Sequence, residues 1–216
     1  MRFGKFLAAA VAGVLVAGAA SAATVVNGGF EDVSGLNKGG LNKGSYGIYE
    51  SISGWTKATG GGIELQNNAT LGNRDANSGN WYVELDSTRN SSMYQDITFS
   101  TAGVYAMSFF YAPRTKTPGD NGVSYSIANG SSELVSGLVD GVAPADWMKV
   151  TSGSFKVDAG DTLRLTFSAE GISNSLGGFI DDVSIAPVPL PASALLLMGA
   201  LSGMGIAARR RKSRAA

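Results

Sequence analysis

The stretch Thr162-Leu163-Arg164-Leu165-Thr166-Phe167 decides the fold class, because apolar and polar residues alternate strictly along it. Successive side chains of a β-strand point to opposite faces. Leu163, Leu165 and Phe167 are therefore expected to face a core, and their polar neighbours to face solvent. The turn residues Asp158-Ala159-Gly160-Asp161 precede the stretch. The pattern predicts a half-buried strand.

Similar short segments recur along the chain, with no convincing helix between them. The segment 104–112 places four large side chains on one face, which we expect in the core: Tyr105, Met107, Phe109 and Tyr111. Asn129-Gly130 is a strong hairpin-turn signal, and 92–99 is expected to pair with 104–112. The expected strands are 25–26, 53–55, 62–65, 81–86, 92–99, 104–112, 123–128, 133–138, 147–157, 162–167 and 178–185. This pattern predicts an all-β antiparallel β-sandwich, with a jelly roll as the leading topology.

The residues between the two ends of the chain, 23–186, are expected to form a single domain with a sizeable core. They carry ten Lys and Arg against seventeen Asp and Glu, a net charge of about −7. Nucleic acid and anionic lipid need a cationic surface, so neither is expected as a partner. The sequence contains no Cys and no His, which excludes disulfides, thiol nucleophiles, Ser-His-Asp triads and His-ligated zinc.

Three short motifs carry a resemblance to known domains: Asn27-Gly28-Gly29-Phe30-Glu31, Trp81-Tyr82-Val83-Glu84-Leu85-Asp86 and Phe179-Ile180-Asp181-Asp182-Val183. They resemble the galactose-binding-domain-like jelly rolls found in many carbohydrate-binding modules. In those modules the first turn and the last strand lie together and hold a structural calcium ion. The resemblance implies a Ca²⁺ site built from Asn27, Glu31, Asp181 and Asp182. The alternative is that Asp181 or Asp182 caps a turn or pairs with Arg164.

Sugar rings stack on exposed aromatic faces while polar side chains bond their hydroxyls. The candidates for such a role are Trp55, Trp81, Tyr82, Arg89, Arg114 and Trp147, together with Asn80 and Asn90. Aromatic residues of a sandwich are more often in its core, and the sequence does not decide between the two. Glu64, Glu84 and Asp86 are the candidates for a catalytic carboxylate pair. No nucleophile elbow or phosphate-binding loop accompanies them, so we expect no enzymatic activity.

Both ends of the chain contain targeting features. Arg2 and Lys5 precede an apolar run, and Ala20-Ser21-Ala22 is typical of a signal-peptide cleavage site, so residues 1–22 are expected to form a signal-peptide helix cut after Ala22. An uncleaved N-terminal anchor is the alternative.

At the other end, residues 192–208 contain no charge over 17 positions. As a transmembrane helix they would span about 25 Å, the short end of what crosses a bilayer. The tail that follows includes Arg209, Arg210 and Arg211, and it should stay cytoplasmic. Before this apolar run stands Val188-Pro189-Leu190-Pro191-Ala192, whose prolines favour an extended chain.

Residues 187–216, with a proline motif, an apolar run and a basic tail, resemble the PEP-CTERM sorting signals of exosortase-dependent bacterial surface proteins, in the VPLPA variant. A plain membrane anchor is the alternative. The resemblance implies signal peptidase and an exosortase-type enzyme as partners, an inner-membrane intermediate, and a final place at the cell surface or outside the cell. The expected role is non-catalytic, in the envelope or extracellular matrix, with exopolysaccharide as the candidate ligand. The alternatives are a glycan hydrolase and a structural, self-associating surface protein.

Overall fold

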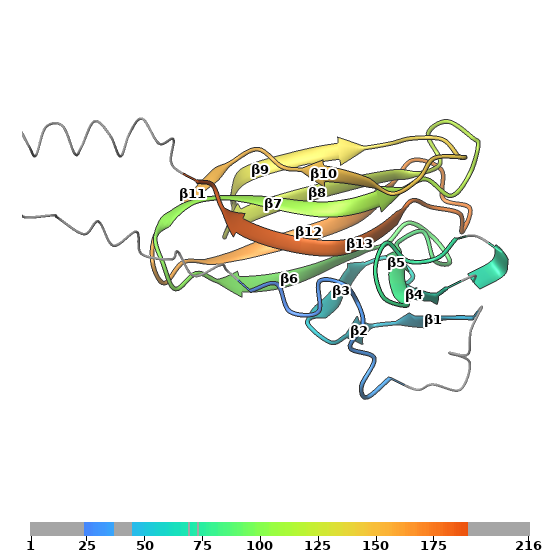
Figure 1. The fold of residues 1–216 in the computed structure, drawn as a ribbon, viewed down its shortest axis with the longest axis horizontal. Helices are drawn as coiled ribbons and strands as arrows, with labels where there is room; N and C mark the ends of the chain where they lie inside the picture. Colours follow the sequence, from blue (N-terminus) through green and yellow to red (C-terminus); the bar gives the residue numbers. More distant parts are fainter. Residues whose placement is uncertain (1–23, 37–44, 69, 73, 190–216) are drawn as a thin grey trace, which may run out of the picture.

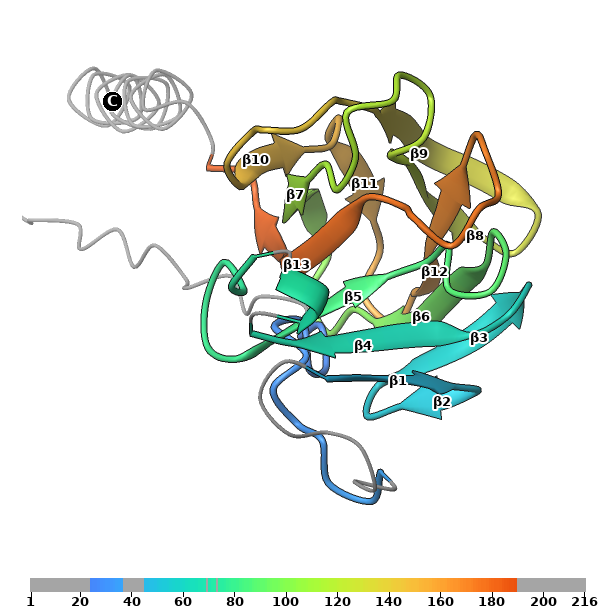
Figure 2. The ribbon, with the colours of Figure 1, turned by 90° about the vertical axis from the view of Figure 1, so that its right-hand side faces the viewer.

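The computed structural model describes residues 24–36, 45–68, 70–72 and 74–189. Within these residues the chain forms two antiparallel β-sheets, which confirms the predicted all-β sandwich. Most strands run along the long axis of the molecule in Figure 1, and Figure 2 looks along that axis. The described residues contain no helix beyond a single 3₁₀ turn, η1 (Thr70–Gly72).

Sheet A is the sheet that contains the last strand, β13. In spatial order its strands are β1 (Tyr46–Tyr49), β4 (Ile63–Asn67), β5 (Trp81–Glu84), β13 (Phe179–Pro187), β7 (Gly103–Ala112) and β10 (Met148–Thr151). The short β11 (Phe155–Val157) also pairs with β7. Strands from both halves of the chain therefore meet at the centre of this sheet.

Sheet B is the second layer. Its strands, in spatial order, are β2 (Ser51–Ile52), β3 (Trp55–Thr59), β6 (Ser92–Thr98), β12 (Thr162–Glu170), β8 (Gly122–Asn129) and β9 (Ser132–Val139). The hairpin predicted at Asn129-Gly130 is confirmed, because β8 and β9 pair directly and Gly130 takes a φ of 58°. A positive φ at this position suits glycine, which has no Cβ to clash.

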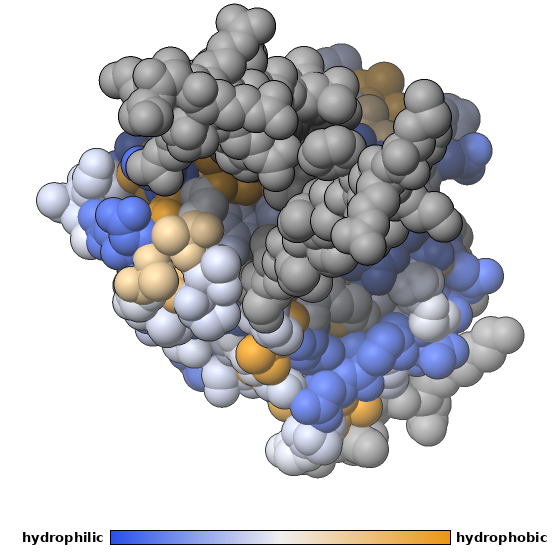
Figure 3. All heavy atoms as spheres, turned by 60° about the vertical axis from the view of Figure 1, so that its left-hand side comes forward, coloured by the Kyte–Doolittle hydropathy of each residue, from blue (hydrophilic) through white to orange (hydrophobic). Residues whose placement is uncertain are grey.

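The core lies between the two sheets and contains the faces that the alternation predicts. Leu163, Leu165 and Phe167 of β12 are buried, as is the predicted stripe of β7. Aromatic rings from both sheets meet there: Phe109 and Phe167 lie 4.9 Å apart between ring centres, at 75°. Such edge-to-face pairs stabilise a core beyond the area they bury. Outside the core, Figure 3 shows apolar side chains as small patches among polar ones.

Two expectations for the strands were wrong. Residues 92–99 and 104–112 do not pair: β6 lies between β3 and β12 in sheet B, and β7 lies in sheet A. The chain crosses from one layer to the other at this connection, as in a sandwich whose two inner faces share one core. Val25 and Val26 do not form a strand either; Asn27–Phe30 form a turn whose amide of Phe30 bonds to the carbonyl of Asn27.

Among the residues that the structure describes, no helix is long and apolar enough to cross a membrane. The expected signal peptide and its cleavage site at Ala22 lie outside these residues. So do the expected membrane segment, the tail with Arg209, Arg210 and Arg211, and the motif residues from Leu190 onward. Of the motif, Val188 and Pro189 are described: both are exposed, and the amide of Val188 bonds to the carbonyl of Val104.

Candidate functional site

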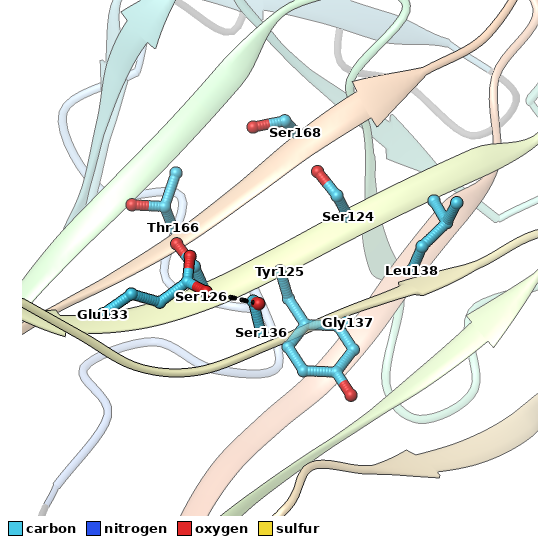
Figure 4. Close-up of a pocket in the computed structure, with 9 residues that line it drawn as sticks. All are labelled: Ser124, Tyr125, Ser126, Glu133, Ser136, Gly137, Leu138, Thr166 and Ser168. Carbon is cyan, nitrogen blue, oxygen red and sulfur yellow. Dashed lines mark hydrogen bonds between the residues drawn. The ribbon is translucent and has the colours of Figure 1, made fainter.

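The outer face of sheet B carries small hydroxyl side chains that face one another across three strands. Ser126 on β8 lies opposite Thr166 on β12 and Ser136 on β9, and Ser124 lies opposite Ser168. Side chains alternate along a strand, so these residues face outward while their neighbours fill the core. Figure 4 shows Ser124, Thr166 and Ser168 rising from the same side of the sheet.

These hydroxyls line a shallow hollow with a volume of about 440 Å³. Glu133 and Leu138 of the edge strand β9 also line it. The hydroxyl of Ser136 donates to Oε1 of Glu133 over 2.6 Å, which is the dashed line in Figure 4. The ring of Tyr125 lies on the other side of the sheet in this view, and it packs against Phe109 of the core. Most side chains that face the hollow are therefore polar, with the aliphatic side chain of Leu138 at its rim.

A second hollow of about 370 Å³ lies on the neighbouring part of the same face, lined by Asp96, Gly130, Thr162 and Arg164. Arg164 donates from Nε and Nη2 to the two carboxylate oxygens of Asp96, at 2.7 and 2.8 Å. Its guanidinium carbon also lies 3.9 Å from the ring centre of Tyr94. These contacts hold both planar groups in fixed orientations.

The whole face can bind a ligand that both donates and accepts hydrogen bonds. Hydroxyl groups do both, the carboxylates of Glu133 and Asp96 accept, and Arg164 donates. These groups are partly or fully exposed, so a ligand could reach them without a change of fold. The first hollow crosses β9, β8 and β12, and the second crosses β12 and β6. A ligand lying across both would therefore be extended.

The aromatic residues predicted for ligand binding lie elsewhere. Trp55 and Trp81 are 1% and 9% exposed and belong to the core, where Trp55 packs between Phe30 and Phe167. Tyr82 is also buried, on the outer face of sheet A. None of the three presents a ring face to a sugar in this structure. They are buried because the loops cover sheet A from outside and because Trp55 and Trp81 point inward.

The other predicted ligand residues have three different environments. Arg89 is exposed, and Nη2 bonds to the carbonyl of Gly60. Arg114 is partly buried, with a side chain that is 9% exposed, and forms an ion pair with Glu84. Trp147 is half-buried, with its indole N–H bonded to the carbonyl of Asp75 at 2.9 Å. Of the three, Arg114 and Trp147 lie close to the same buried aromatic pair, Tyr82 and Phe179, on the outer face of sheet A. Asn80 and Asn90 lie in loops away from the hollows of sheet B.

The three carboxylates considered for catalysis are brought together but are buried. Glu64 lies opposite Glu84 across β4 and β5, and the amide of Gln66 bonds to both, at 2.8 and 3.0 Å. Burial raises the pKa of Glu64 to about 7 and that of Glu84 to about 9. Asp86 accepts backbone amides from residues 174 to 176, so its carboxylate holds a loop in place. Each of the three carboxylates is therefore bonded within the protein and holds its structure together.

Three of the four residues predicted to hold calcium contact one segment, the loop 77–80 and the first residue of β5, Trp81. Glu31 accepts the amides of Asn80 and Trp81 through Oε1, at 2.7 and 2.8 Å. Asp181 accepts the amide of Asn77 at 2.9 Å, and Asp182 accepts the side chains of Asn77 and Ser78. The first turn and the last strand are thus joined at this loop.

Asn27 departs from the predicted set. Its side-chain amide bonds to the carbonyls of Asp32 and Ser53, away from the carboxylates. Asp181 and Asp182 stand at a bulge of β13, where Asp182 takes a φ of 49°, and Arg164 pairs with Asp96 instead of either. Among the described residues no three acidic side chains gather as a metal ion would require. In this structure the carboxylates of Glu31, Asp181 and Asp182 accept hydrogen bonds from residues 77–81, and calcium stays a prediction.

Comparisons with known proteins find likenesses in architecture alone. No family model and no curated protein matches the chain. A solved structure of TmCBM61 in complex with β-1,4-galactotriose is 19% identical over 71% of this chain and 97% of that chain, with a TM-score of 0.45. The CBM22-1 xylan-binding domain of Paenibacillus barcinonensis Xyn10C is 15% identical over 68% and 94%, with a TM-score of 0.43. A CBM4 structure is 16% identical over 76% and 100%, also with a TM-score of 0.43.

Proposed function

We propose that this domain is a non-catalytic carbohydrate-binding domain that takes an extended, neutral glycan across the outer face of sheet B. The observation that carries the proposal is the hollow of about 440 Å³ lined by hydroxyls of β8, β9 and β12. It adjoins the fixed pair of Asp96 and Arg164 on the same face. Sugar hydroxyls need donors and acceptors in alternation, and this surface offers both.

The charge of the domain supports a neutral ligand. The net charge of about −7 between the two ends of the chain disfavours polyanions. The residues that line the two hollows include two carboxylates and one guanidinium, and Glu170, which accepts the hydroxyl of Ser124, adds a third carboxylate to this face. The face therefore offers no excess of positive charge to an anion. A neutral polysaccharide meets neither objection, and its hydroxyls can replace the water on the serine and threonine side chains.

The positions of the carboxylates support a non-catalytic role. Glycoside hydrolysis needs two carboxyl groups flanking the scissile bond, about 5 to 9.5 Å apart. Glu64 and Glu84 are 4% and 0% exposed, and both are bonded within the protein. A glycan could not reach them without removing the loops that cover them. We therefore propose binding without hydrolysis.

The setting in which the domain acts is a proposal from the sequence of the two ends. Residues 1–22 and 187–216 have the features of a signal peptide and of a sorting signal. The glycan is then a component of the envelope or extracellular matrix, and exopolysaccharide is the expected partner.

Titration calorimetry tests the binding face. We expect the purified body, residues 23–186, to bind at least one of β-1,4-linked gluco-, galacto-, manno- or xylo-oligosaccharides, with no release of reducing sugar. The variant Ser126→Arg fills the hollow and should weaken binding at least tenfold. The matched control Ser184→Arg makes the same change on the exposed outer face of β13. Binding that survives Ser126→Arg unchanged, or no binding to any of the four, would overturn the proposal.

A further inference from the structure

The opposite face of the sandwich, the outer face of sheet A, holds an arginine between two aromatic rings. The guanidinium carbon of Arg74 lies 5.7 Å from the ring centre of Trp147 and 5.9 Å from that of Phe179. Trp147 is itself fixed, by its bond to Asp75 and by an edge-to-face contact with Tyr82 at 5.9 Å. Such contacts orient a planar cation and hold it in one place.

Arg74 has no ion-pair partner among the described residues, although it is half-buried. Its two protein hydrogen bonds run from Nη2 to the carbonyls of Pro113 and Ala145, at 3.1 and 2.9 Å. Nε and Nη1 have no protein acceptor in the described part of the chain. Burial lowers the pKa of Arg74, and the nearby charge of Asp146 opposes this shift without forming an ion pair. Neither atom is among the buried polar atoms of the described residues that lack a partner, so both are open to solvent and available to a ligand.

The arginine borders a hollow of about 390 Å³ that is lined by Arg74, Pro144, Ala145 and Asp146. Asp146 is exposed and supplies acceptors to the same hollow. One wall is therefore a fixed donor, another is an acceptor, and the remaining two residues are small and apolar. We call this hollow the Arg74 recess.

The charges of the recess select the class of ligand. An anion would meet Asp146 in the same hollow and the negative field of the domain, and a cation would meet Arg74. A neutral ligand with adjacent hydroxyls can accept from the guanidinium and donate to the carboxylate at once. The volume of the hollow lies at the low end of small-molecule sites, which suits one or two sugar units rather than a long chain.

We propose that the Arg74 recess is a second saccharide site, for a neutral sugar unit, so that one molecule holds two glycans on opposite faces of the sandwich. The proposal that the recess binds a sugar depends only on the residues of the recess. The proposal that one molecule holds two glycans rests also on the proposed function of sheet B. With both sites occupied by different chains, the protein would cross-link a polysaccharide network.

Trp147 gives the recess its own readout. Trp55 and Trp81 are core residues, so the half-buried Trp147 is the tryptophan most open to solvent. We expect the fluorescence of the body to change on titration with at least one of galactose, glucose, mannose or xylose, or their β-1,4-linked trisaccharides. Acrylamide quenching should decrease in the same titration. Trp147→Phe should remove both effects, which assigns the signal to this residue.

Asp146→Asn tests the ligand contacts, because Asp146 is exposed and its replacement should not disturb the fold. We expect it to weaken the fluorescence titration at least fivefold. The control Asp140→Asn alters an exposed acid of the same connection that does not line the hollow, and it should have no effect. An absent fluorescence change with all the sugars named, or equal titrations for Asp146→Asn and Asp140→Asn, would overturn the second site.

An agglutination assay distinguishes the sheet B site from the Arg74 recess. It uses beads coated with the trisaccharide that the protein binds most tightly. The wild-type body should agglutinate them, and Asp146→Asn and Ser126→Arg should each abolish agglutination while leaving single-site binding. A Trp147 signal that persists in Ser126→Arg shows that the recess works alone. Calorimetric binding that Ser126→Arg abolishes, without any Trp147 signal in the wild type, would leave sheet B as the site and refute the recess.

Discussion

Glu64 and Glu84 are two acids that share one buried environment on the outer face of sheet A. Both accept the amide of Gln66, and Glu84 also accepts Nη1 of Arg114 and the amide of Gly177. With one guanidinium facing Glu84, two full negative charges are not balanced here. Burial is the main cause of the raised pKa values, and for Glu84 the charge of Glu64 adds to it. The pair therefore favours a proton in the folded state.

The proton has a consequence for stability. The pKa of Glu64 is about 7 in the folded protein and about 4.5 when the chain is unfolded. Its contribution is then fully present below pH 4.5 and is lost as the pH rises through 7. We expect Glu64→Gln, which copies the protonated form, to match the wild type at pH 4.5 and to exceed it by about 3 kcal/mol at pH 8. Urea unfolding at both pH values measures this.

The control for this prediction is Glu170→Gln, at an exposed carboxylate of β12 that accepts the hydroxyl of Ser124 on the neighbouring strand β8. It should leave the dependence of the unfolding free energy on pH unchanged. If Glu64→Gln kept the wild-type dependence, Glu64 would be ionised in the folded protein and the shared-proton account would fail.

At the scale of elements, alternation predicted which residues form the core but not which strands pair. The inward faces of β12 and β7 follow directly from their sequences, because a period of two is set by the backbone. The pairing of β6 with β3 and β12 depends on where the chain crosses between layers, and no local pattern records that. A hairpin between 92–99 and 104–112 would have satisfied the same alternation. The local sequence determines which side chains of a strand face the core, whereas the packing of the whole core determines which strands pair.

The bulge at Asp181 and Asp182 shows the same limit for the candidate metal residues. Strict alternation would place the two carboxylates on opposite faces of β13. The register shifts between Asp181 and Ser184, and the two carboxylates instead bind the same loop, at Asn77 and Ser78. The motif therefore indicated that the chain ends meet here. It could not indicate that amides of a distant loop would donate hydrogen bonds to the carboxylate oxygens of these residues.

Asp181 tests how this loop is held. Its Oδ2 accepts the amides of Asn77 and Ser78, at 2.9 and 3.3 Å. Asn at this position would offer one acceptor and turn an N–H toward other donors, so buried amides would lose their partners. Burial and the charge of Asp182 raise the pKa of Asp181 to about 7, so at pH 8 the variant also removes a buried charge, which offsets part of this loss. We expect Asp181→Asn to lower the free energy of unfolding by about 2 kcal/mol at pH 5, where Asp181 is protonated, and by less at pH 8. The control Asp158→Asn, at an exposed turn, should change it little.

The same variant tests the calcium prediction. Melting temperatures of the body are compared in excess Ca²⁺ and in EDTA. A higher melting temperature in Ca²⁺ that Asp181→Asn removes would establish a metal at the predicted residues, after a rearrangement of the loop. Equal melting temperatures in both solutions would show that hydrogen bonds from the amides alone connect the first turn to the last strand.

At the scale of the molecule, the candidate site could not be predicted from the sequence, for a physical reason. Its hydroxyls come from β8, β9 and β12, and a serine on one strand carries no sign of the serine opposite it. The alternation did place Thr162, Arg164 and Thr166 outward, which is confirmed. Aromatic residues are typical of sugar sites, but their large apolar rings also stabilise a core, and Trp55 and Trp81 are buried there.

The two ends of the chain decide where these faces act, and the mass of the protein from the producing cells tests them. The prolines at 187, 189 and 191 are expected to favour an extended chain, the form in which a protease binds its substrate. We expect the recovered protein to lack residues 1–22 and everything after about Pro191. The variant carrying both Pro189→Ala and Pro191→Ala lets a helix continue upstream, so it should keep the basic tail and stay in the membrane fraction. A wild-type protein that also keeps the tail would be a plain anchored protein, and glycan binding would then act at the inner membrane rather than in an extracellular matrix.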